Sequence, residues 1–519
     1  MQHAHDILRL SCEGGTCRRG KQIHDNKVKV MIRNVLTAIA IFTVPVILTI
    51  FTLSDLIFSP FTYALWLTME VGVFTTIIYL SNYRKSKEIK APLVQEFRKY
   101  RVAALVVSYN EDPSTVRETL LSVKEAIGSL GDVFLLDDST DRMKAEENEE
   151  FCRNNGITYL HREGRRGYKA GAINDFLKKY GDSYDLIAVF DSDQRPVRTF
   201  FLDLLPFFND ENVAFVQVPQ AYTEVFSRLA MGATYQQMPF HDVVMSGRDI
   251  SGSAFILGSG FIARIEALRK AGYFDEEIVT EDLATTLKLQ SLGYRSIYVN
   301  YPGIWYGEPP QTVDAYMVQQ GRWSLGSFQS FMRILRSRIG WRVFLDYFAG
   351  FLYWLKEGPL TIVELLAPII FLTLQVYIFR VDPFIFSLAY YPVLLFSILL
   401  FILSMRDRRY GIRGFLYHQF VEFLMMPPVT LSFIAWALRR KRPFRVTPKG
   451  REIKISRWIF LYILIELLLI FSIIKGIFWY NLASLNSLRY SIIINLTWAA
   501  YFLFLTSGTF IIFLEKKNI

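Results

Sequence analysis

The chain has 519 residues, of which 52% are hydrophobic and 20% are charged, and its formal net charge at pH 7 is +10. This composition is too apolar for an ordinary soluble enzyme and too charged for a pure bundle of membrane helices, so it predicts a hybrid of the two. The positive charge requires no nucleic acid as a partner, because basic cytoplasmic loops beside anionic lipid headgroups account for it. The three cysteines, Cys12, Cys17 and Cys152, do not suggest a disulfide framework.

Apolar runs with few charged residues, long enough to cross roughly 30 Å of bilayer hydrocarbon, divide the chain. Two of them precede a long soluble region and four follow it. The six predicted spans are Val35–Leu53, Ile57–Leu80, Gly358–Phe379, Phe384–Leu403, Trp458–Phe478 and Tyr490–Leu514. The sequence therefore predicts a basic tail at 1–33, followed by pairs of membrane helices within 34–82, 343–405 and 457–514.

A further apolar segment, Val421–Leu438, has basic residues at both ends, including Arg413 and Arg439. Because basic residues mark the cytoplasmic side, we expect an interfacial helix and a loop within 406–456 rather than another span. With six spans, the N-terminal tail, the soluble region and the tail at 515–519 all fall on the cytoplasmic side. We expect a multi-pass protein of the plasma (cell) membrane.

Residues 97–342 alternate apolar runs of strand length with segments of helix length. The predicted strands are Val102–Ser108, Val133–Asp137, Ile157–His161 and Leu186–Phe190, and Asp112 is the predicted N-cap of the helix after the first strand. This rhythm is typical of an α/β domain with a mostly parallel sheet and helices on both faces. In such a sheet, ligands bind outside the carboxyl ends of the strands.

Charged residues stand at those predicted strand ends. Acidic clusters follow three of the strands, at Ser108–Glu111, Asp137–Asp141 and Asp191–Asp193, and the cation-rich run Arg162–Gly171 places Lys169 at the start of a helix. The two acidic residues of the third cluster alternate along one strand, so both point to the same side. Carboxylates plus cations on one edge indicate a divalent metal ion and a phosphorylated ligand.

The order of these motifs resembles a known family, the processive family 2 glycosyltransferases, which includes the cellulose, chitin and hyaluronan synthases. The motifs that carry the resemblance are Ser108–Glu111, Asp137–Ser139, Lys169–Gly171, Asp191–Asp193, Phe215–Gln220, Thr280–Asp282, Gln319–Trp323 and Phe444–Lys449. The last is similar to the gating loop of bacterial cellulose synthase catalytic subunits. The resemblance implies a cytoplasmic, Rossmann-like GT-A-type domain inserted between membrane helices, about two before it and four after it.

The family also implies an activity and partners. The expected activity is an inverting hexosyltransfer from a nucleotide-diphosphate sugar, such as UDP-glucose, that extends a β-linked polysaccharide and passes it across the membrane. Accessory export subunits are possible further partners. Glu70, Glu364 and Glu466 lie inside apolar segments, where ionisable groups usually face a wet interior, as a polysaccharide path requires. No cyclic-di-GMP-binding module follows the last predicted span, so regulation by that nucleotide is not expected.

The resemblance assigns roles residue by residue. Asp282 matches the catalytic base and Glu281 adjoins it, while Asp193 and Asp191 match the ligands of a Mg²⁺ or Mn²⁺ ion. Trp323 matches the acceptor site. The expected donor-binding residues are Ser108, Tyr109, Glu111, Asp137, Asp138, Lys169, Asp191, Gln319 and Arg322, with Asp137 preferred over Asp138 for the direct contact. The expected gating-loop residues are Phe444, Val446, Thr447 and Lys449.

Other interpretations stay open at this point. The chain could transfer a single sugar to a polyprenyl phosphate, or it could be a polysaccharide channel or assembly subunit with an inactive transferase domain. Taken singly, Asp191 and Asp193 fit an ordinary turn after a strand, Asp282 fits a helix N-cap, and Trp323 fits a membrane-interface anchor. The donor sugar also stays open, because the motif variants at Asp137–Asp141 and Gly167–Gly171 look like those of plant mannan synthases as well.

Overall fold

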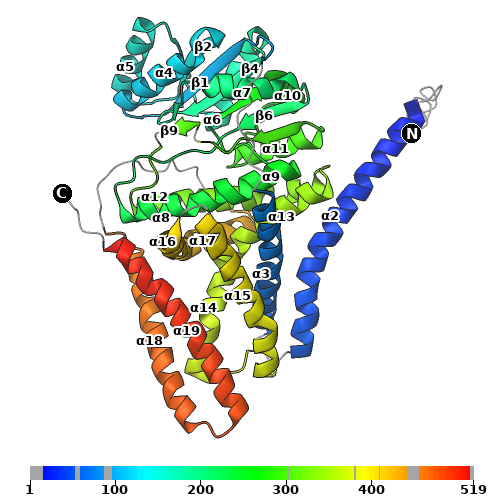
Figure 1. The fold of residues 1–519 in the computed structure, drawn as a ribbon, viewed down its shortest axis with the longest axis vertical. Helices are drawn as coiled ribbons and strands as arrows, with labels where there is room; N and C mark the ends of the chain where they lie inside the picture. Colours follow the sequence, from blue (N-terminus) through cyan, green and yellow to red (C-terminus); the bar gives the residue numbers. More distant parts are fainter. Residues whose placement is uncertain are drawn as a thin grey trace.

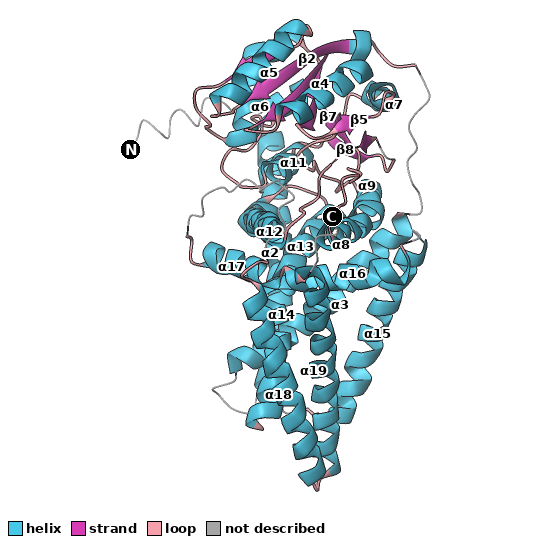
Figure 2. Cartoon of the chain, turned by 90° about the vertical axis from the view of Figure 1, so that its left-hand side faces the viewer, coloured by secondary structure: helices cyan, strands magenta, loops and turns pink. Residues whose placement is uncertain are grey.

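In a computed structural model, an α/β domain stands on a bundle of long helices, with a layer of crosswise helices between them (Figure 1). The structure describes residues 16–52, 59–86, 96–301, 303–305, 307–378, 381–407, 410–440 and 455–514. In the described part of the chain, strands occur only in the α/β domain (Figure 2). The predicted gating-loop residues, Phe444, Val446, Thr447 and Lys449, lie outside the described residues.

The described part of the domain contains a seven-stranded sheet in the order β3-β2-β1-β4-β7-β6-β8. Its strands are β1 (Val102–Ser108), β2 (Gly131–Asp137), β3 (Thr158–His161), β4 (Leu186–Asp191), β6 (Val213–Gln217), β7 (Phe261–Arg264) and β8 (Arg295–Tyr298). Only β7 runs antiparallel to its neighbours in this sheet. A second, two-stranded sheet pairs β5 (Arg195–Pro196) with β9 (Ile304–Trp305). The predicted mostly parallel α/β fold is therefore confirmed.

Both faces of the large sheet are covered by helices. On β1, Val102, Ala104 and Val106 belong to one buried cluster, while Ala103 and Leu105 belong to another on the opposite face. Because neighbouring strand residues point to opposite faces, a strand buried on both sides is apolar throughout. The covering helices are α4 (Pro113–Ile127), α5 (Arg142–Asn154), α6 (Tyr168–Tyr180), α7 (Phe200–Leu204), α10 (Ile265–Lys270) and α11 (Glu281–Ser291).

The predicted start of α4 is also confirmed. The Asp112 side chain accepts a hydrogen bond from the backbone N–H of Ser114 at 2.8 Å, and Pro113 is the first helical residue. Proline suits this position because the first helical N–H has no partner within the helix.

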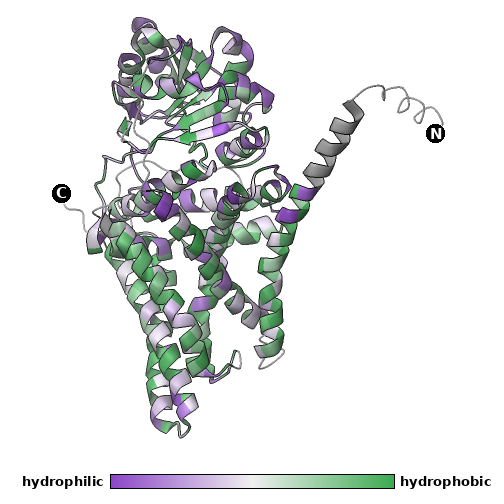
Figure 3. Ribbon diagram, turned by 45° about the vertical axis from the view of Figure 1, so that its right-hand side comes forward, coloured by the Kyte–Doolittle hydropathy of each residue, from purple (hydrophilic) through white to green (hydrophobic). Residues whose placement is uncertain are grey.

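Between the domain and the bundle, helices α8, α12 and α16 lie crosswise to the long helices (Figures 1 and 2). The elements of this region are α8 (Arg228–Pro239), the π-helix η5 (Phe240–Met245), α9 (Ser246–Ser251), α12 (Val313–Arg336), α13 (Trp341–Leu355), α16 (Gly411–Leu424) and α17 (Met426–Ala437). The long helices below are α2 (Thr16–Thr52), α3 (Ser59–Lys85), α14 (Thr361–Leu374), α15 (Pro383–Asp407), α18 (Ile459–Leu482) and α19 (Asn486–Phe513). The described parts of these long helices consist largely of hydrophobic residues (Figure 3).

Seven helical segments of the described chain are long and apolar enough to cross a membrane, one more than the sequence predicted. Six of them overlap the predicted spans. The seventh, Gly411–Ala437, contains the segment predicted to lie in the interface. It is divided at Met425 into α16 and α17, with Pro427 and Pro428 at the start of α17. The crosswise direction of α16 fits an interfacial position, which stays a prediction.

The boundaries of two predicted segments differ in the structure. Helix α2 begins at Thr16, so part of the predicted basic tail at 1–33 is helical. The third membrane segment continues from α13 through a π-helix, η6 (Lys356–Leu360), into α14, which ends at Leu374 with Gln375 in the left-handed conformation. The charged residues of η6 therefore lie within one continuous helical segment, which joins α13 to α14.

Candidate active site at the carboxyl ends of the strands

The strand register brings the predicted acidic loops to one edge of the sheet. Ser108 at the end of β1 pairs with Asp137 at the end of β2, and Val107 pairs with Asp191 at the end of β4. Since these three strands are parallel and end at the same level, the loops that follow them emerge side by side. This edge is the candidate active site.

Asn110 joins the first two loops. Its Oδ1 accepts hydrogen bonds from the backbone N–H groups of Thr140 at 2.9 Å and Asp141 at 3.0 Å, and its own backbone N–H donates to Ser139 Oγ at 2.7 Å. Asn110 has a φ of 53°, a left-handed conformation that asparagine tolerates better than most residues. The loops 108–111 and 137–141 therefore form one hydrogen-bonded unit.

The Asp137 carboxylate is buried and accepts four hydrogen bonds within the domain. The donors are Ser139 N at 2.9 Å, Ser139 Oγ at 2.5 Å, Asn148 Nδ2 at 3.2 Å and Tyr159 OH at 3.3 Å. A carboxylate has about four acceptor positions, so its capacity is used by the protein itself. These bonds give Asp137 a structural role in shaping the loop, and its direct contact with the donor stays a prediction.

Its neighbour Asp138 is held by an arginine that the sequence did not single out. Arg162 donates to both Asp138 oxygens, at 2.8 and 2.6 Å, and also to Asp175 at 3.0 Å. Its guanidinium further donates to the carbonyls of Arg166 and Tyr168, at 3.1 and 2.9 Å. Arg162 thus fixes the loop before α6 onto the end of β2.

The predicted cation and the first aspartate of the metal motif meet directly. Lys169 Nζ, in the first turn of α6, forms an ion pair with Asp191 Oδ1 at the end of β4. The other Asp191 oxygen accepts a hydrogen bond from Ser259 Oγ at 2.8 Å, and Gln220 Nε2 donates to the same Ser259 Oγ at 2.9 Å. Ser259 lies between Gly258 and Gly260, which both have positive φ.

The predicted catalytic pair lies at the start of α11. Burial and the neighbouring charge of Glu281 raise the pKa of Asp282 to about 7, and the charge of Lys169 opposes this rise. Burial also raises the pKa of Glu281, against the charges of Lys169 and Arg322. A Cβ atom on Gly258 would lie 3.5 Å from Asp282 Oδ2. The loop at Gly258–Gly260, whose Ser259 donates to Asp191, therefore also passes beside Asp282. Asp282 therefore can exchange a proton near neutral pH.

Arg322 on α12 completes this group of charges. Burial lowers the pKa of Arg322, and the charges of Glu281, Asp191 and Asp282 counteract that effect, which places the guanidinium within electrostatic reach of all three. Helix α12 packs closely against the start of α11 at Gly326. A Cβ atom on Gly326 would lie 2.3 Å from Thr280 Cγ2, so the absence of a side chain at this position allows the contact.

Other predicted residues of α12 and the first loop are nearby. Gln319 and Trp323 are half-buried and, four residues apart, share one face of α12. Gln320 Nε2 donates to Gln319 Oε1 at 3.4 Å. Ser108 is buried, and its Oγ has no hydrogen-bond partner among the described residues, while Glu111 is half-buried. The expected roles of these residues in donor and acceptor binding stay predictions.

The predicted metal ligands form a pair rather than a complete site. Burial raises the pKa of Tyr222, and the charges of Asp193 and Asp191 raise it further, so both carboxylates lie around this hydroxyl. Within the described ranges, no group of three or more His, Cys, Asp and Glu side chains is placed to hold a metal ion. Two carboxylates still fit a hard divalent cation that completes its shell with phosphate and water oxygens.

Among the residues of this edge that were not predicted individually are Arg162, Tyr222 and Ser259. Arg162 belongs to the cation-rich run, and Ser259 stands in a Gly-Ser-Gly sequence, a local signal for a backbone that approaches other groups closely. Tyr222 follows the predicted Phe215–Gln220 motif by two residues. No local pattern showed which acidic group each of them would meet.

Comparison with known proteins identifies the family of these motifs. The family described as "Glycosyl transferase family group 2" matches residues 186–514. A cellulose synthase catalytic subunit [UDP-forming] of Pseudomonas fluorescens (strain SBW25) is 27% identical over 437 residues, which cover 80% of this chain and 57% of that protein. The corresponding subunit of Xanthomonas axonopodis pv. citri (strain 306) is 32% identical over 238 residues, which cover 44% of this chain and 31% of that protein.

The matched region thus spans 57% of the length of the first of these curated relatives and 31% of the second. Among solved structures, the mannosyltransferase PcManGT from Pyrobaculum calidifontis, in complex with GDP-Man and Mn²⁺, matches with a TM-score of 0.50. It is 16% identical in sequence, and the match covers 72% of this chain and 98% of that one. At this identity the likeness concerns the fold, which is the GT-A-like arrangement predicted from the motifs.

Proposed function

The chain belongs to glycosyl transferase family group 2, and we propose that it is a membrane-embedded inverting glycosyltransferase that extends a β-linked polysaccharide. The donor in this proposal is a nucleotide-diphosphate sugar, with UDP-glucose the first to test because relatives are named UDP-forming cellulose synthases. The observation that carries the proposal is the convergence of Lys169, Asp191, Asp282 and Arg322 from four separate elements.

In the proposed reaction, Asp282 accepts the proton of the acceptor hydroxyl as that oxygen attacks the sugar. Its raised pKa suits this role, because a base is most effective when its pKa lies near the working pH. Attack from the face opposite the diphosphate inverts the anomeric centre. Lys169 and Arg322 neutralise the charge that grows on the departing diphosphate, in a part of the site where burial strengthens electrostatic interactions.

A divalent cation, Mg²⁺ or Mn²⁺, belongs to the proposal. Asp193 would hold it together with Asp191, whose carboxylate is oriented by Lys169 and Ser259. When bound, such an ion supplies Lewis-acid neutralisation of the diphosphate. The Mn²⁺ in the structure of the mannosyltransferase with the same type of fold supports this choice of cofactor.

Polar groups continue from α12 into the helices below it, which supports a path for the product. Tyr316 of α12 donates to Gln236 Oε1 at 2.8 Å and to the Val421 carbonyl at 3.0 Å. Glu422, which follows Val421 on α16, accepts a hydrogen bond through Oε1 from Tyr353 OH at 2.9 Å. Buried ionisable groups beneath a catalytic domain mark a wet interior rather than a lipid-facing surface.

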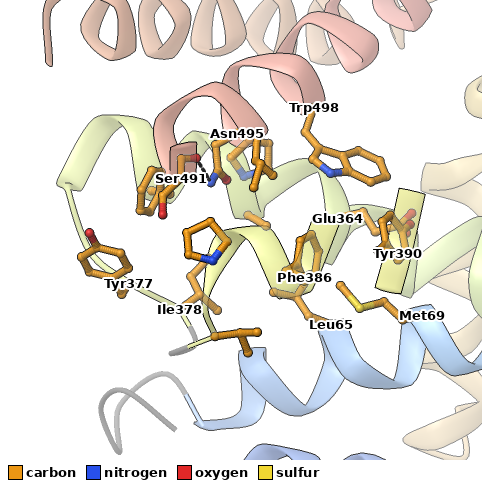
Figure 4. Close-up of a pocket in the computed structure, with 16 residues that line it drawn as sticks. Leu65, Met69, Glu364, Tyr377, Ile378, Phe386, Tyr390, Ser491, Asn495 and Trp498 are labelled. Atoms are coloured by element: carbon orange, nitrogen blue, oxygen red, sulfur yellow. Dashed lines mark hydrogen bonds between the residues drawn. The ribbon is translucent and has the colours of Figure 1, made fainter. Parts of the chain in front are cut away.

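The same polar region extends toward a pocket between α3, α14, α15 and α19 (Figure 4). Lys356 Nζ lies 3.0 Å from Glu357 Oε1 in η6, and Glu364, one of the predicted intramembrane glutamates, lines the pocket with Tyr390 and Trp498. Aromatic faces and hydroxyl-binding groups are the two kinds of surface that a pyranose chain uses. We propose that the growing polysaccharide leaves through this region.

The remaining predicted intramembrane glutamates lie on other helices. Glu466 of α18 accepts a hydrogen bond from Ser507 Oγ of α19 at 2.8 Å, which is a contact between neighbouring helices. Glu70 of α3 has a buried Oε2 without a hydrogen-bond partner among the described residues. Of the three, Glu364 is the one that supports the proposed path.

The proposed orientation places the α/β domain and both termini in the cytoplasm of the cell, at the plasma membrane. Arg84 and Lys85 end α3 on the side of the α/β domain, and Arg413 lies in the crosswise helix α16. Basic residues next to membrane helices favour the cytoplasmic side, and they also favour contact with anionic lipid headgroups.

A donor panel tests the proposed function. Detergent-purified full-length protein is incubated with Mg²⁺ or Mn²⁺ and with UDP-glucose, GDP-mannose, UDP-N-acetylglucosamine and UDP-glucuronate, and both the released nucleoside diphosphate and the product length are measured. We expect one donor to give nucleotide release together with long polymer. A product carrying one added sugar would favour single transfer to a lipid, and absence of turnover with every donor would favour an inactive subunit.

Replacing Trp323 with Ala tests processivity. The indole face can support the terminal sugar of the chain without fixing its hydroxyls, so its loss should shorten the product to oligomers while nucleotide affinity changes less than about threefold. Product length is measured by gel permeation and nucleotide affinity by calorimetry. Trp323→Phe, which keeps an aromatic face, is the matched control and should retain longer products. Normal polymer from Trp323→Ala would make Trp323 an interface anchor.

A further inference from the structure

An arginine covers the aromatic ring at the end of β1. The Arg165 guanidinium carbon lies 3.3 Å from the centre of the Tyr109 ring and 5.3 Å from that of Tyr168. Tyr109 directly follows the last residue of β1 and is one of the expected donor-binding residues. At 3.3 Å the two groups are in van der Waals contact, which leaves no space for another ring on this face of Tyr109.

No hydrogen bond fixes Arg165 Nε in this position. The Nε atom is buried and has no hydrogen-bond partner among the described residues. Its neighbours are different, because Arg162 binds Asp138 and Asp175, while Arg166 binds Asp175 and Glu276. Stacking on the Tyr109 ring is therefore the closest contact described for the Arg165 side chain.

The backbone around Arg165 is held firmly, so a rearrangement would have to involve the side chain. The Arg165 carbonyl accepts a hydrogen bond from Tyr168 N at 3.0 Å, and Arg162 binds the carbonyls on either side of Gly167. A Cβ atom on Gly171 would lie 1.9 Å from the Arg166 carbonyl oxygen, so glycine lets this loop pack directly on α6. The long Arg165 side chain can change rotamer without disturbing these contacts.

We propose that Arg165 occupies the stacking position of the donor's nucleobase and is displaced when the donor binds, which makes it a determinant of nucleotide affinity. A guanidinium is planar and stacks on aromatic faces as a base does, so it protects the Tyr109 ring until a larger aromatic group replaces it. This inference rests on the proposed function, because it requires that the nucleobase binds at Tyr109.

The experiment compares a ligand that has a base with one that lacks it. Calorimetry measures the binding of UDP and of inorganic pyrophosphate, each with Mg²⁺, to the full-length wild type, Arg165→Ala and the control Arg166→Ala. The control removes the same charge from the same loop without uncovering Tyr109. Relative to Arg166→Ala, we expect Arg165→Ala to bind UDP about threefold or more tightly, because UDP no longer breaks a cation–π contact. Pyrophosphate affinity should be equal in the two variants.

A second set of variants, made in Tyr109→Leu, tests whether the Tyr109 ring causes the difference in UDP affinity. In Tyr109→Leu, the advantage of Arg165→Ala for UDP should disappear, because the aromatic face is gone. Weaker UDP binding by Arg165→Ala than by Arg166→Ala would overturn the proposal and make Arg165 a nucleotide ligand. An equal change for UDP and pyrophosphate would overturn it as well, since only charge would then matter. If GDP or ADP binds the wild type more tightly than UDP does, that nucleotide replaces UDP in these measurements. Failure of the wild type to bind any of the three would count against the proposed function itself.

Discussion

Replacing Asp282 with Asn should lower sugar transfer by about 10²-fold or more while donor binding persists. The substitution keeps the size of the side chain at the start of α11 but removes the group that accepts the acceptor's proton. Turnover is measured as nucleoside diphosphate release, and donor affinity by calorimetry. Loss of donor affinity together with turnover would show that Asp282 is a ligand-binding or structural residue.

The pH dependence provides an independent check of the same role. Burial and the charge of Glu281 raise the pKa of Asp282 to about 7, and a base acts only in its ionised form. Activity of the wild type should therefore rise with pH through this value and level off above about pH 8. Glu281→Gln removes the like charge, so it should shift the rising limb to lower pH. An unshifted limb would assign the titration to another group.

Replacing Asp193 with Asn should abolish turnover, as should chelation of divalent cations from the wild type. The described residues contain no group of three side chains placed to hold a metal ion, so the loss of one of the two carboxylates around Tyr222 should leave too few oxygen ligands. Added Mg²⁺ or Mn²⁺ should restore the chelated wild type and leave Asp193→Asn inactive. Asp182→Asn, at an exposed carboxylate that pairs with Arg269, is the control and should behave as wild type.

The incomplete ligand set gives this prediction a second measurement. If the diphosphate supplies the missing oxygens, the wild type should bind Mn²⁺ more tightly in the presence of UDP than in its absence, and Asp193→Asn should lose this difference. Mn²⁺ binding is followed by electron paramagnetic resonance of the free ion. Metal-dependent turnover by Asp193→Asn would remove this residue from the proposed site.

Features that depend on neighbouring residues in the chain could be predicted from the sequence. The strand Val102–Ser108 was recognised because both faces of a buried parallel strand are apolar, and the N-cap at Asp112 because its signal lies within three residues. The membrane segments were recognised because about 20 apolar residues are needed to cross the bilayer. The acidic clusters were predicted to share an edge because parallel strands end at the same side of a sheet.

The tertiary structure decided which groups these residues meet. Asp137 and Asp138 are adjacent and chemically identical, yet one is saturated by hydrogen bonds from its own loop and α5, and the other binds Arg162. Arg165 and Arg166 are equally ambiguous in sequence, although one stacks on Tyr109 and the other pairs with acidic residues. The raised pKa of Asp282 depends mainly on burial, which packing between elements decides, and Lys169 of α6, distant in the chain, opposes the rise. Such differences arise from packing between elements, because burial and electrostatic energies depend on distances in space that local sequence patterns do not encode.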